Sequence, residues 1–470
     1  MDDVLWNRTG LELAAMIAGG EVSSREVVDA HLERIDAVNG RLNAAVLILD
    51  DEARNAADAA DRVISSGLPT GPFHGVPMTV KDGLDLAGHP TTYGVEAFAD
   101  GIAALDDPGI GRLKAAGAIP IAKTNLPEMG MRIATDNPLF GLTRNPWHPD
   151  RTAGGSSGGE ASAIASGMSP MGMGTDLGGS VRNPAYCCGI AATKTSLGRL
   201  PVCGSSPNAA EPMVARQLMS VAGPMARSVA DLEAMLRVTI GRHPRDPRTV
   251  DVAYDGAPVA RRVAIPTDLP GGPVHADARQ AIQRASDALV DAGWEVVDTV
   301  PPEVERCLEV WGHLLGHDFP ATLASLDDAM SVDGSHLMRA LVDFWPASGM
   351  PSHVAHAERF RLARLWAGFL ADHPVVVLPT WYQPPFDHHE DLTDDRDALR
   401  SLYDGVFTPI VPANLLGLPA TQVPVGLGAD GTPLGVQCLA DRHREDVTLA
   451  AAAIVEAAFP PLTPIDPATG

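Results

Sequence analysis

A stretch of small residues from 145 to 182 constrains this chain more than any other part of its sequence. It carries two clusters of glycine and serine, at 154–159 and 174–182, and few large side chains. Such a stretch is either a flexible linker or a place where the backbone must approach another group closely. A helix pattern at 161–165 and a strand pattern at 171–175 lie inside it. Because a linker does not usually sit between such elements, we predict closely packed, functional backbone.

The rest of the chain alternates between helix and strand patterns, which favours an α/β fold. No convincing linker interrupts it, so we predict a single domain over 1–470, largely helical in its first 70 residues. Predicted strands lie at 73–80, 119–122, 171–175, 262–265, 295–300 and 375–378. Predicted helices run from a serine cap at residue 23 or 24 to 35, and over 110–116, 161–165, 277–292, 446–458 and, with breaks, 303–345.

Charge and cysteine content exclude several kinds of partner. The formal net charge is -24, and a broad acidic field repels phosphate backbones, so we expect no direct nucleic-acid partner. No apolar run reaches the roughly 18 residues that span a bilayer. Five scattered cysteines are typical of reduced thiols. With no signal pattern at the N-terminus, a cytoplasmic location is expected, and the adjacent Cys187 and Cys188 make a poor metal site.

The second cluster offers groups suited to cutting an amide bond. A serine hydroxyl needs a base to become a nucleophile, and the resulting oxyanion needs donors aimed at it. Successive backbone N–H groups of residues 177–180 could supply those donors. The base could be a histidine or a lysine. The chain has four lysines, and Lys81 follows an apolar strand pattern, where partial burial could keep its amine neutral.

The first cluster taken alone permits other interpretations. Residues 154–158 match the G-x-S-x-G nucleophile elbow, which would make Ser156 the nucleophile with a histidine base. That elbow needs a buried strand directly before it, whereas residues 145–153 contain two prolines and polar side chains. A phosphate-binding loop would need a Lys-Ser/Thr ending that is absent here. Each cluster alone is therefore weak evidence.

In combination, the motifs resemble the amidase-signature family. The resemblance spans most of the chain and is densest at 75–200. The matching segments are 74–83 (HGVPMTVKDG), 123–125 (KTN), 141–147 (GLTRNPW), the two clusters, 188–189 (CG), 223–231 (GPMARSVAD), 378–380 (LPT) and 414–420 (NLLGLPA). The resemblance implies one large α/β domain with a central twisted mixed sheet flanked by helices.

The resemblance also implies a Ser–Ser–Lys triad. Ser180 is expected to be the nucleophile, Ser156 the proton relay and Lys81 the base. The family holds the relay serine after a cis peptide, here Gly155–Ser156. The expected product of attack is an acyl-enzyme that water hydrolyses, and no metal or organic cofactor is implied.

Other residues take supporting roles by the same resemblance. The oxyanion hole falls on the N–H groups of Leu177, Gly178, Gly179 and Ser180. We expect Ser157, Asp176 and Arg182 to orient these loops. Lys123 and Lys194 match family positions and are interpreted as surface or packing residues.

The substrate pocket is where the chain departs from the family pattern. Gly130, Met131 and Arg132 follow the KTN motif in the segment that usually lines the acyl pocket, where many relatives carry a small residue in place of Arg132. Arg132 either pairs with a polar substrate group or points to solvent. Trp381 and Tyr382 either form another wall of the pocket or are packing aromatics.

Three functions follow from these patterns. The leading hypothesis is an amidase that hydrolyses the C–N bond of a small carboxylic amide without a partner subunit. The second is the A subunit of a glutamyl-tRNA amidotransferase, which releases ammonia from glutamine within a complex. The third is a non-catalytic relative that binds ligands. The substrate and any homo-oligomerisation stay open.

Overall fold

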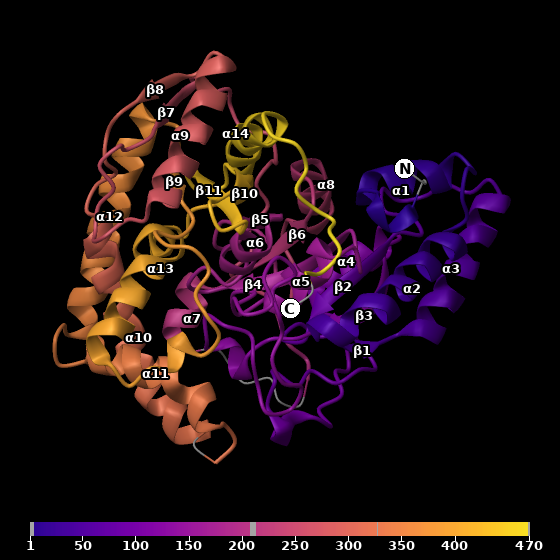
Figure 1. The fold of residues 1–470 in the computed structure, drawn as a ribbon, viewed down its shortest axis with the longest axis horizontal. Coiled ribbons are helices and arrows are strands. Elements are labelled where there is room, and N and C mark those ends of the chain that lie inside the picture. The colour runs from indigo at the N-terminus through magenta and orange to yellow at the C-terminus, as the bar shows by residue number, and fades with distance from the viewer. Residues whose placement is uncertain (1–3, 207–212, 327, 469–470) are drawn as a thin grey trace.

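The computed structural model describes residues 4–206, 213–326 and 328–468. Within these ranges eleven strands form one mixed sheet flanked by helices (Figure 1), which confirms the predicted α/β class. The strands are β1 (Ala45–Ile48), β2 (Pro77–Lys81), β3 (Ile119–Thr124), β4 (Met171–Asp176), β5 (Ala191–Lys194), β6 (Val221–Ala226), β7 (Arg262–Ala264), β8 (Glu295–Val297), β9 (Val375–Pro379), β10 (Ala420–Leu427) and β11 (Pro433–Leu439).

The sheet is built from two halves of the chain. Its strand order is β1-β3-β2-β4-β6-β5-β10-β11-β9-β7-β8. The halves meet where β5 pairs antiparallel with β10, with Ala420 opposite Lys194. Strands β3, β2 and β4 are parallel to one another, as are β9, β7 and β8, and the pairs between these groups are antiparallel.

The parallel pair β2 and β4 brings the end of β2 next to the loop that follows β4. Neighbouring parallel strands end at the same edge of a sheet. Lys81 is the last residue of β2 and Asp176 is the last residue of β4. The loop that follows β4 therefore begins beside Lys81. All five residues of β2 are buried, so Lys81 lies in the core of the protein.

The helices begin largely where the sequence predicts. Ser23 caps α2 through a capping box in which its side chain accepts from the Glu26 N–H and the Glu26 side chain accepts in return. The helices are α1 (Gly10–Ala18), α2 (Ser24–Leu42), α3 (Asp50–Ser65), α4 (Pro108–Ala115), α5 (Gly158–Ala165), α6 (Arg182–Cys188), α7 (Val214–Met219), α8 (Val229–Thr239), α9 (Ala276–Asp291), α10 (Val304–Leu326), α11 (Val332–Phe344), α12 (Ser352–Asp372), α13 (Arg396–Leu416) and α14 (Glu445–Ala457), with short 3-10 helices η1 (Leu5–Asn7), η2 (Glu96–Phe98), η3 (Glu128–Gly130) and η4 (Glu390–Leu392).

The predicted broken helix over 303–345 is two helices, α10 and α11. Ser331 begins the second one, because its side chain accepts a hydrogen bond from the Gly334 N–H at 2.9 Å. In Figure 1 α10, α11 and α12 lie at the opposite side of the molecule from the N-terminal helices α1, α2 and α3. Helices α10 and α13 pack against each other beside the sheet.

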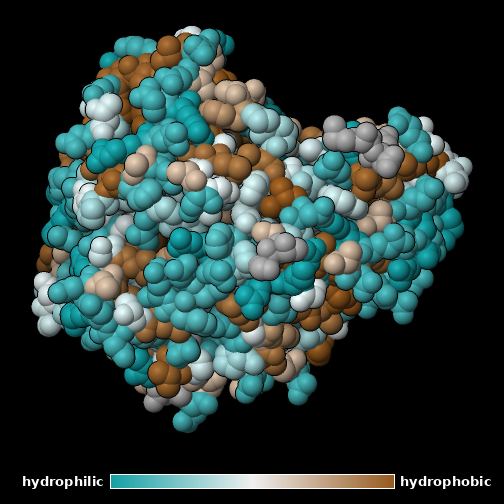
Figure 2. Space-filling model, in the orientation of Figure 1, coloured by the Kyte–Doolittle hydropathy of each residue, from teal (hydrophilic) through white to brown (hydrophobic). Residues whose placement is uncertain are grey.

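The outer surface is mixed in polarity. Figure 2 shows hydrophilic residues over most of one face, with hydrophobic residues in small groups. In the part of the chain that the structure describes, no helix is long and apolar enough to cross a membrane.

Candidate active site

Lys81 and Ser156 are in direct contact. The Lys81 Nζ atom lies 2.7 Å from Ser156 Oγ and 3.1 Å from Thr175 Oγ1, and the lysine side chain is 1% exposed. Burial lowers the pKa of Lys81 to about 7, although the nearby charge of Asp176 acts in the opposite direction. A substantial fraction of the amine is therefore neutral near pH 7 and able to accept a proton.

Glu160 is a buried carboxyl whose charge acts on Lys81. Glu160 accepts hydrogen bonds from the hydroxyl groups of Thr79 and Thr124, the latter at 2.7 Å. Burial raises the pKa of Glu160 to about 7 against these hydrogen bonds and the charge of Lys81. Glu160 was not predicted from the sequence. The signal that could have indicated it is a single carboxylate within a run of small residues.

The loop that carries Ser156 is tightly enclosed. Its Gly155–Ser156 peptide is cis, as the family resemblance implies. A Cβ atom at Gly155 would lie 2.5 Å from the Arg132 carbonyl oxygen, so only glycine fits there. The Thr135 hydroxyl donates to the Gly154 carbonyl at 2.8 Å and accepts from the Gly158 N–H at 3.1 Å. These contacts fix the backbone on both sides of Ser156.

The loop that carries Ser180 joins the Ser156 loop through the backbone. The Ser157 N–H donates to the Ser180 carbonyl at 3.1 Å, so the two loops are in direct backbone contact. The Ser157 hydroxyl is buried and has no partner among the described residues. Ser180 itself is partly exposed and faces a cavity. The structure therefore brings Lys81, Ser156 and Ser180 together at one edge of the sheet.

Asp176 organises the predicted oxyanion loop. Its carboxylate accepts from the Gly179 N–H at 2.8 Å and from the Val181 N–H at 3.2 Å. The Gly179 N–H is therefore occupied in this structure, and its expected place in the oxyanion hole stays a prediction. The N–H groups of Leu177, Gly178 and Ser180 have no acceptor among the residues that the structure describes.

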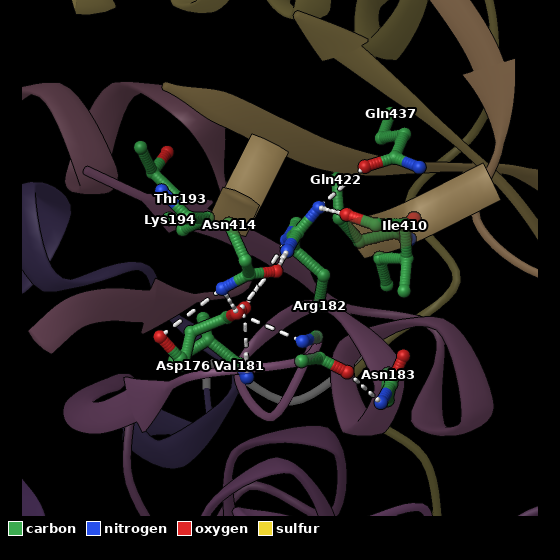
Figure 3. A network of polar contacts seen from close by, with 12 residues as sticks. Asp176, Val181, Arg182, Asn183, Thr193, Lys194, Ile410, Asn414, Gln422 and Gln437 are labelled. Carbon is green, nitrogen blue, oxygen red and sulfur yellow. Dashed lines mark hydrogen bonds and ion pairs between the residues drawn. The ribbon is translucent and has the colours of Figure 1, made fainter. Parts of the chain in front are cut away.

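Arg182 ties this loop to the second half of the chain (Figure 3). Its guanidinium pairs with Asp176, and it donates to the Ile410 carbonyl at 2.9 Å and to the Gln437 and Asn414 side chains at 2.7 Å. Both members of the ion pair are 0% exposed. Burial alone would raise the pKa of Asp176, but Arg182 outweighs it and holds that pKa well below its usual range. Asn414 lies in a recognised motif, whereas no sequence signal marked Gln437.

Lys123 and Lys194 are not surface residues, which corrects one of the two interpretations. Lys123 is 1% exposed, and its Nζ lies 2.6 Å from Asp82 Oδ1. Lys194 is 0% exposed and donates to the carbonyls of Thr195 and Leu418, each at 2.8 Å. Burial lowers the pKa of Lys194 to about 7. Both lysines are buried strand residues: Lys123 is the last but one residue of β3, and Lys194 is the last residue of β5.

An apolar cavity opens at Ser180. The predicted Gly130, Met131 and Arg132 line it, together with Ile133. Its other walls come from α10, α11 and α13: Trp311, Leu315, Phe319, Leu337, Leu341 and Phe407. The sequence analysis missed these residues. The four-residue spacing of the three α10 side chains was the available signal for a shared helix face.

The structure does not include Trp381 and Tyr382 in the cavity lining. Trp381 is 0% exposed and donates its indole N–H to the Asn183 side chain at 2.7 Å. Tyr382 donates its hydroxyl to the Pro270 carbonyl at 2.8 Å. They are packing aromatics, the alternative interpretation, because both polar ends are already satisfied by protein groups.

Arg132 lines the cavity but its charge is already paired. It is 3% exposed, so the interpretation that it points to solvent is wrong. Its Nε and Nη2 atoms both donate to the carboxylate of Asp391 at 2.9 Å, in a bidentate pair. The cavity therefore presents apolar side chains and a compensated ion pair to a ligand.

The described residues contain no group of three or more His, Cys, Asp or Glu side chains placed to hold a metal ion. The arrangement has the parts that acyl transfer to a serine requires: a hydroxyl at a cavity, a buried amine linked to it through a second serine loop, and unoccupied backbone N–H groups.

Comparisons with known proteins agree on one family. The model of the amidase family, described as "Amidase", matches residues 26–449. An indoleacetamide hydrolase of Bradyrhizobium diazoefficiens is 40% identical over 96% of this chain and 86% of its own length. An acylamidase of Rhodococcus erythropolis is 32% identical over 96% of this chain and 95% of its own length. The structure of a bacterial aryl acylamidase superposes with a TM-score of 0.81 at 27% identity, covering 97% of this chain and 96% of that one.

Proposed function

This chain belongs to the amidase family and hydrolyses amide bonds, and we propose that Ser180 is its nucleophile, Ser156 its proton relay and Lys81 its base. The observation that carries the proposal is the buried Lys81 amine, 2.7 Å from Ser156 Oγ. Burial disfavours the charged form of that amine and so equips it to take a proton.

The reaction begins when neutral Lys81 accepts the proton of Ser156 while Ser156 accepts the proton of Ser180. The Ser180 oxygen forms a bond to the amide carbon, and the carbonyl electron pair moves onto oxygen. The N–H groups of Leu177, Gly178 and Ser180, which have no acceptor among the described residues, are the donors suited to stabilise that charge. Collapse breaks the C–N bond, and the proton returns through Ser156 to the leaving nitrogen. Water then hydrolyses the ester by the same relay.

The cavity supports an amide with an uncharged, apolar acyl group. Three aromatic rings and several aliphatic side chains line it, and the charge of Arg132 is compensated by Asp391. A substrate carboxylate in this cavity would have to displace Asp391 or lose its hydration without compensation. The names of the two curated relatives, which specify indoleacetamide and acylamides, agree with this class. We propose arylalkyl and related apolar amides as substrates, hydrolysed without a partner subunit.

Labelling of the purified chain tests the proposed nucleophile. After treatment with a serine-directed fluorophosphonate, mass spectrometry should find the label on Ser180. Ser180→Ala should abolish labelling, and Lys81→Ala and Ser156→Ala should slow it severely. Lys114→Ala is the matched control, because Lys114, on α4, is 37% exposed and pairs with Asp106. A label on Ser156, or full activity of Lys81→Ala, would overturn the mechanism.

Product release tests the substrate class and the independence of the chain. The chain alone should release ammonia or amine from phenylacetamide and from indole-3-acetamide. A chain that is inert on these amides, yet releases ammonia from glutamine when partner subunits and tRNA are added, would replace this proposal with the amidotransferase function.

A further inference from the structure

Trp311 contacts the nucleophile loop from a distant helix. It lies on α10, is 2% exposed and lines the cavity at Ser180. Its indole N–H donates to the Leu177 carbonyl at 3.1 Å. Its ring is tilted against Phe407 of α13, with centroids 5.0 Å apart. The side chain is therefore fixed at both its polar and its apolar end.

The indole lies directly on Gly178. A Cβ atom at Gly178 would be 2.7 Å from Trp311 Cζ2, closer than side-chain atoms approach one another. The absence of a side chain at residue 178 is what lets the indole reach the loop backbone. Loop and ring are thus matched in shape as well as joined by a hydrogen bond.

This hydrogen bond controls a peptide group that bears an unoccupied donor. The Leu177 carbonyl and the Gly178 N–H belong to one planar peptide and point in opposite directions. Holding the oxygen therefore sets the direction of the N–H, which has no acceptor among the described residues. A hydrogen bond to the carbonyl also polarises the peptide and strengthens its N–H as a donor.

The next peptide of the loop is held differently. The Gly179 N–H is bound by Asp176, and the Gly178 carbonyl accepts from the Asn183 side chain at 3.2 Å. Both of those residues flank the loop in sequence. Trp311 is separated from Leu177 by 134 residues and reaches the loop through tertiary packing.

We propose that Trp311 is a positioning residue that directs the Gly178 N–H toward the oxyanion of the tetrahedral intermediate. The proposal rests on the function proposed above, in which the loop after β4 stabilises that intermediate. Because the same indole forms a wall of the cavity, the acyl group of a substrate packs against the group that orients the donor.

Two substitutions separate the indole N–H from the bulk of the ring. Trp311→Phe removes the donor and keeps an aromatic wall. Replacement of Trp311 by β-(3-benzothienyl)alanine through amber suppression keeps the bicyclic shape and removes only the N–H. The matched control is Trp366→Phe on α12, because Trp366 is 0% exposed and donates to the Pro302 carbonyl at 2.8 Å, outside the cavity lining.

The readouts are the rate constant for fluorophosphonate labelling of Ser180, and kcat and KM for phenylacetamide. Both Trp311 variants should lose about tenfold in labelling rate and in kcat, the value of one well-placed hydrogen bond, with KM changed less than about twofold. Trp366→Phe should keep wild-type rates. Rates for the benzothienyl variant within about twofold of wild type would overturn the proposal, as would an equal loss in Trp366→Phe.

The proposed function fails separately from this inference. If the wild-type label lies on a residue other than Ser180, the proposed nucleophile is wrong. If Ser180 is labelled in the wild type and equally fast in both Trp311 variants, the nucleophile stands and the role of Trp311 is wrong.

Discussion

Lys81 ends a strand whose residues are all buried, and that burial determines the protonation state of its amine. A free lysine amine has a pKa near 10.4 and is almost wholly charged at neutral pH. In this chain the surroundings lower the pKa of Lys81 to about 7. The amine contacts two hydroxyl groups, those of Ser156 and Thr175, rather than a carboxylate that would favour its charged form.

The pH dependence of kcat/KM should follow the deprotonation of Lys81. Because the working base is the neutral amine, activity should fall as pH decreases below the pKa of about 7 and approach a plateau as pH increases above it. Initial rates between pH 5 and pH 10, on a neutral amide, measure this profile. Activity that decreases steadily from pH 6 to pH 9 would contradict a lysine base.

Asp176 should affect catalysis although it does not line the cavity. Asp176→Asn keeps the size of the side chain, but its NH₂ group cannot accept from both the Gly179 and the Val181 N–H, and Arg182 loses its charge partner. We expect fluorophosphonate labelling of Ser180 to slow by about 100-fold, the scale of a displaced oxyanion donor.

Asp231→Asn is the control for that change. Asp231 is also 0% exposed and accepts from two backbone N–H groups, those of Gly10 and Leu11, at 3.0 and 2.9 Å. It should lose thermal stability and keep the wild-type labelling rate. Equal labelling rates in the two variants would show that Asp176 serves stability alone.

At the scale of elements, the Arg132–Asp391 pair joins the cavity loop, residues 130–133, to η4. Asp391→Ala removes both close hydrogen bonds of the buried Arg132 guanidinium and leaves it only the more distant Asp136 carboxylate, 3.9 Å away, so the free energy of unfolding should fall by about 3 kcal/mol. Urea denaturation followed by circular dichroism measures this change. The double variant Arg132→Met, Asp391→Leu should recover most of the loss, because it removes both charges together.

The exposed pair Arg237–Asp255 provides a comparison, since its side chains are 44% and 75% exposed. Asp255→Ala should therefore have little measurable effect on the urea midpoint. If Asp391→Ala is equally mild, the buried pair is not what holds η4 to the cavity loop.

The elements that sequence analysis predicted are those with a clear apolar pattern. β3, β4, β9 and α9 begin within two residues of their predicted bounds. β6 and β10 were missed because Pro224 and Pro424 lie inside them, and proline usually indicates a turn or an edge. Both strands lie in the interior of the sheet, where their pairing is antiparallel.

The site was predictable to the extent that it is local in sequence. The three proposed catalytic residues lie in motifs between 74 and 182, and the structure brings them together. The cavity walls that were not predicted come from residues 311–407, and Arg132 finds its partner 259 residues away. Helical spacing on α10 indicates a buried face but not what it faces, because the tertiary contact decides that.

At the scale of the whole molecule, the formal net charge of -24 should weaken the binding of negatively charged substrates. The KM for a carboxylate-bearing amide should decrease as NaCl increases from 10 to 300 mM, because screening shortens the Debye length to about 10 Å or less above 0.1 M. The KM of phenylacetamide should stay constant. Equal salt dependence for the two substrates would rule out long-range repulsion.

The division of the sheet at β5 and β10 has an evolutionary consequence. The proposed triad and oxyanion loop lie on segments that build the first half of the sheet, whereas α10, α11 and α13, which form one side of the cavity, come later in the chain. Mutations in the later part of the gene can therefore remodel what the enzyme accepts while its bond-breaking groups are inherited unchanged. Trp311 is an exception, because a substitution there would alter both the substrate preference and the proposed support of the oxyanion.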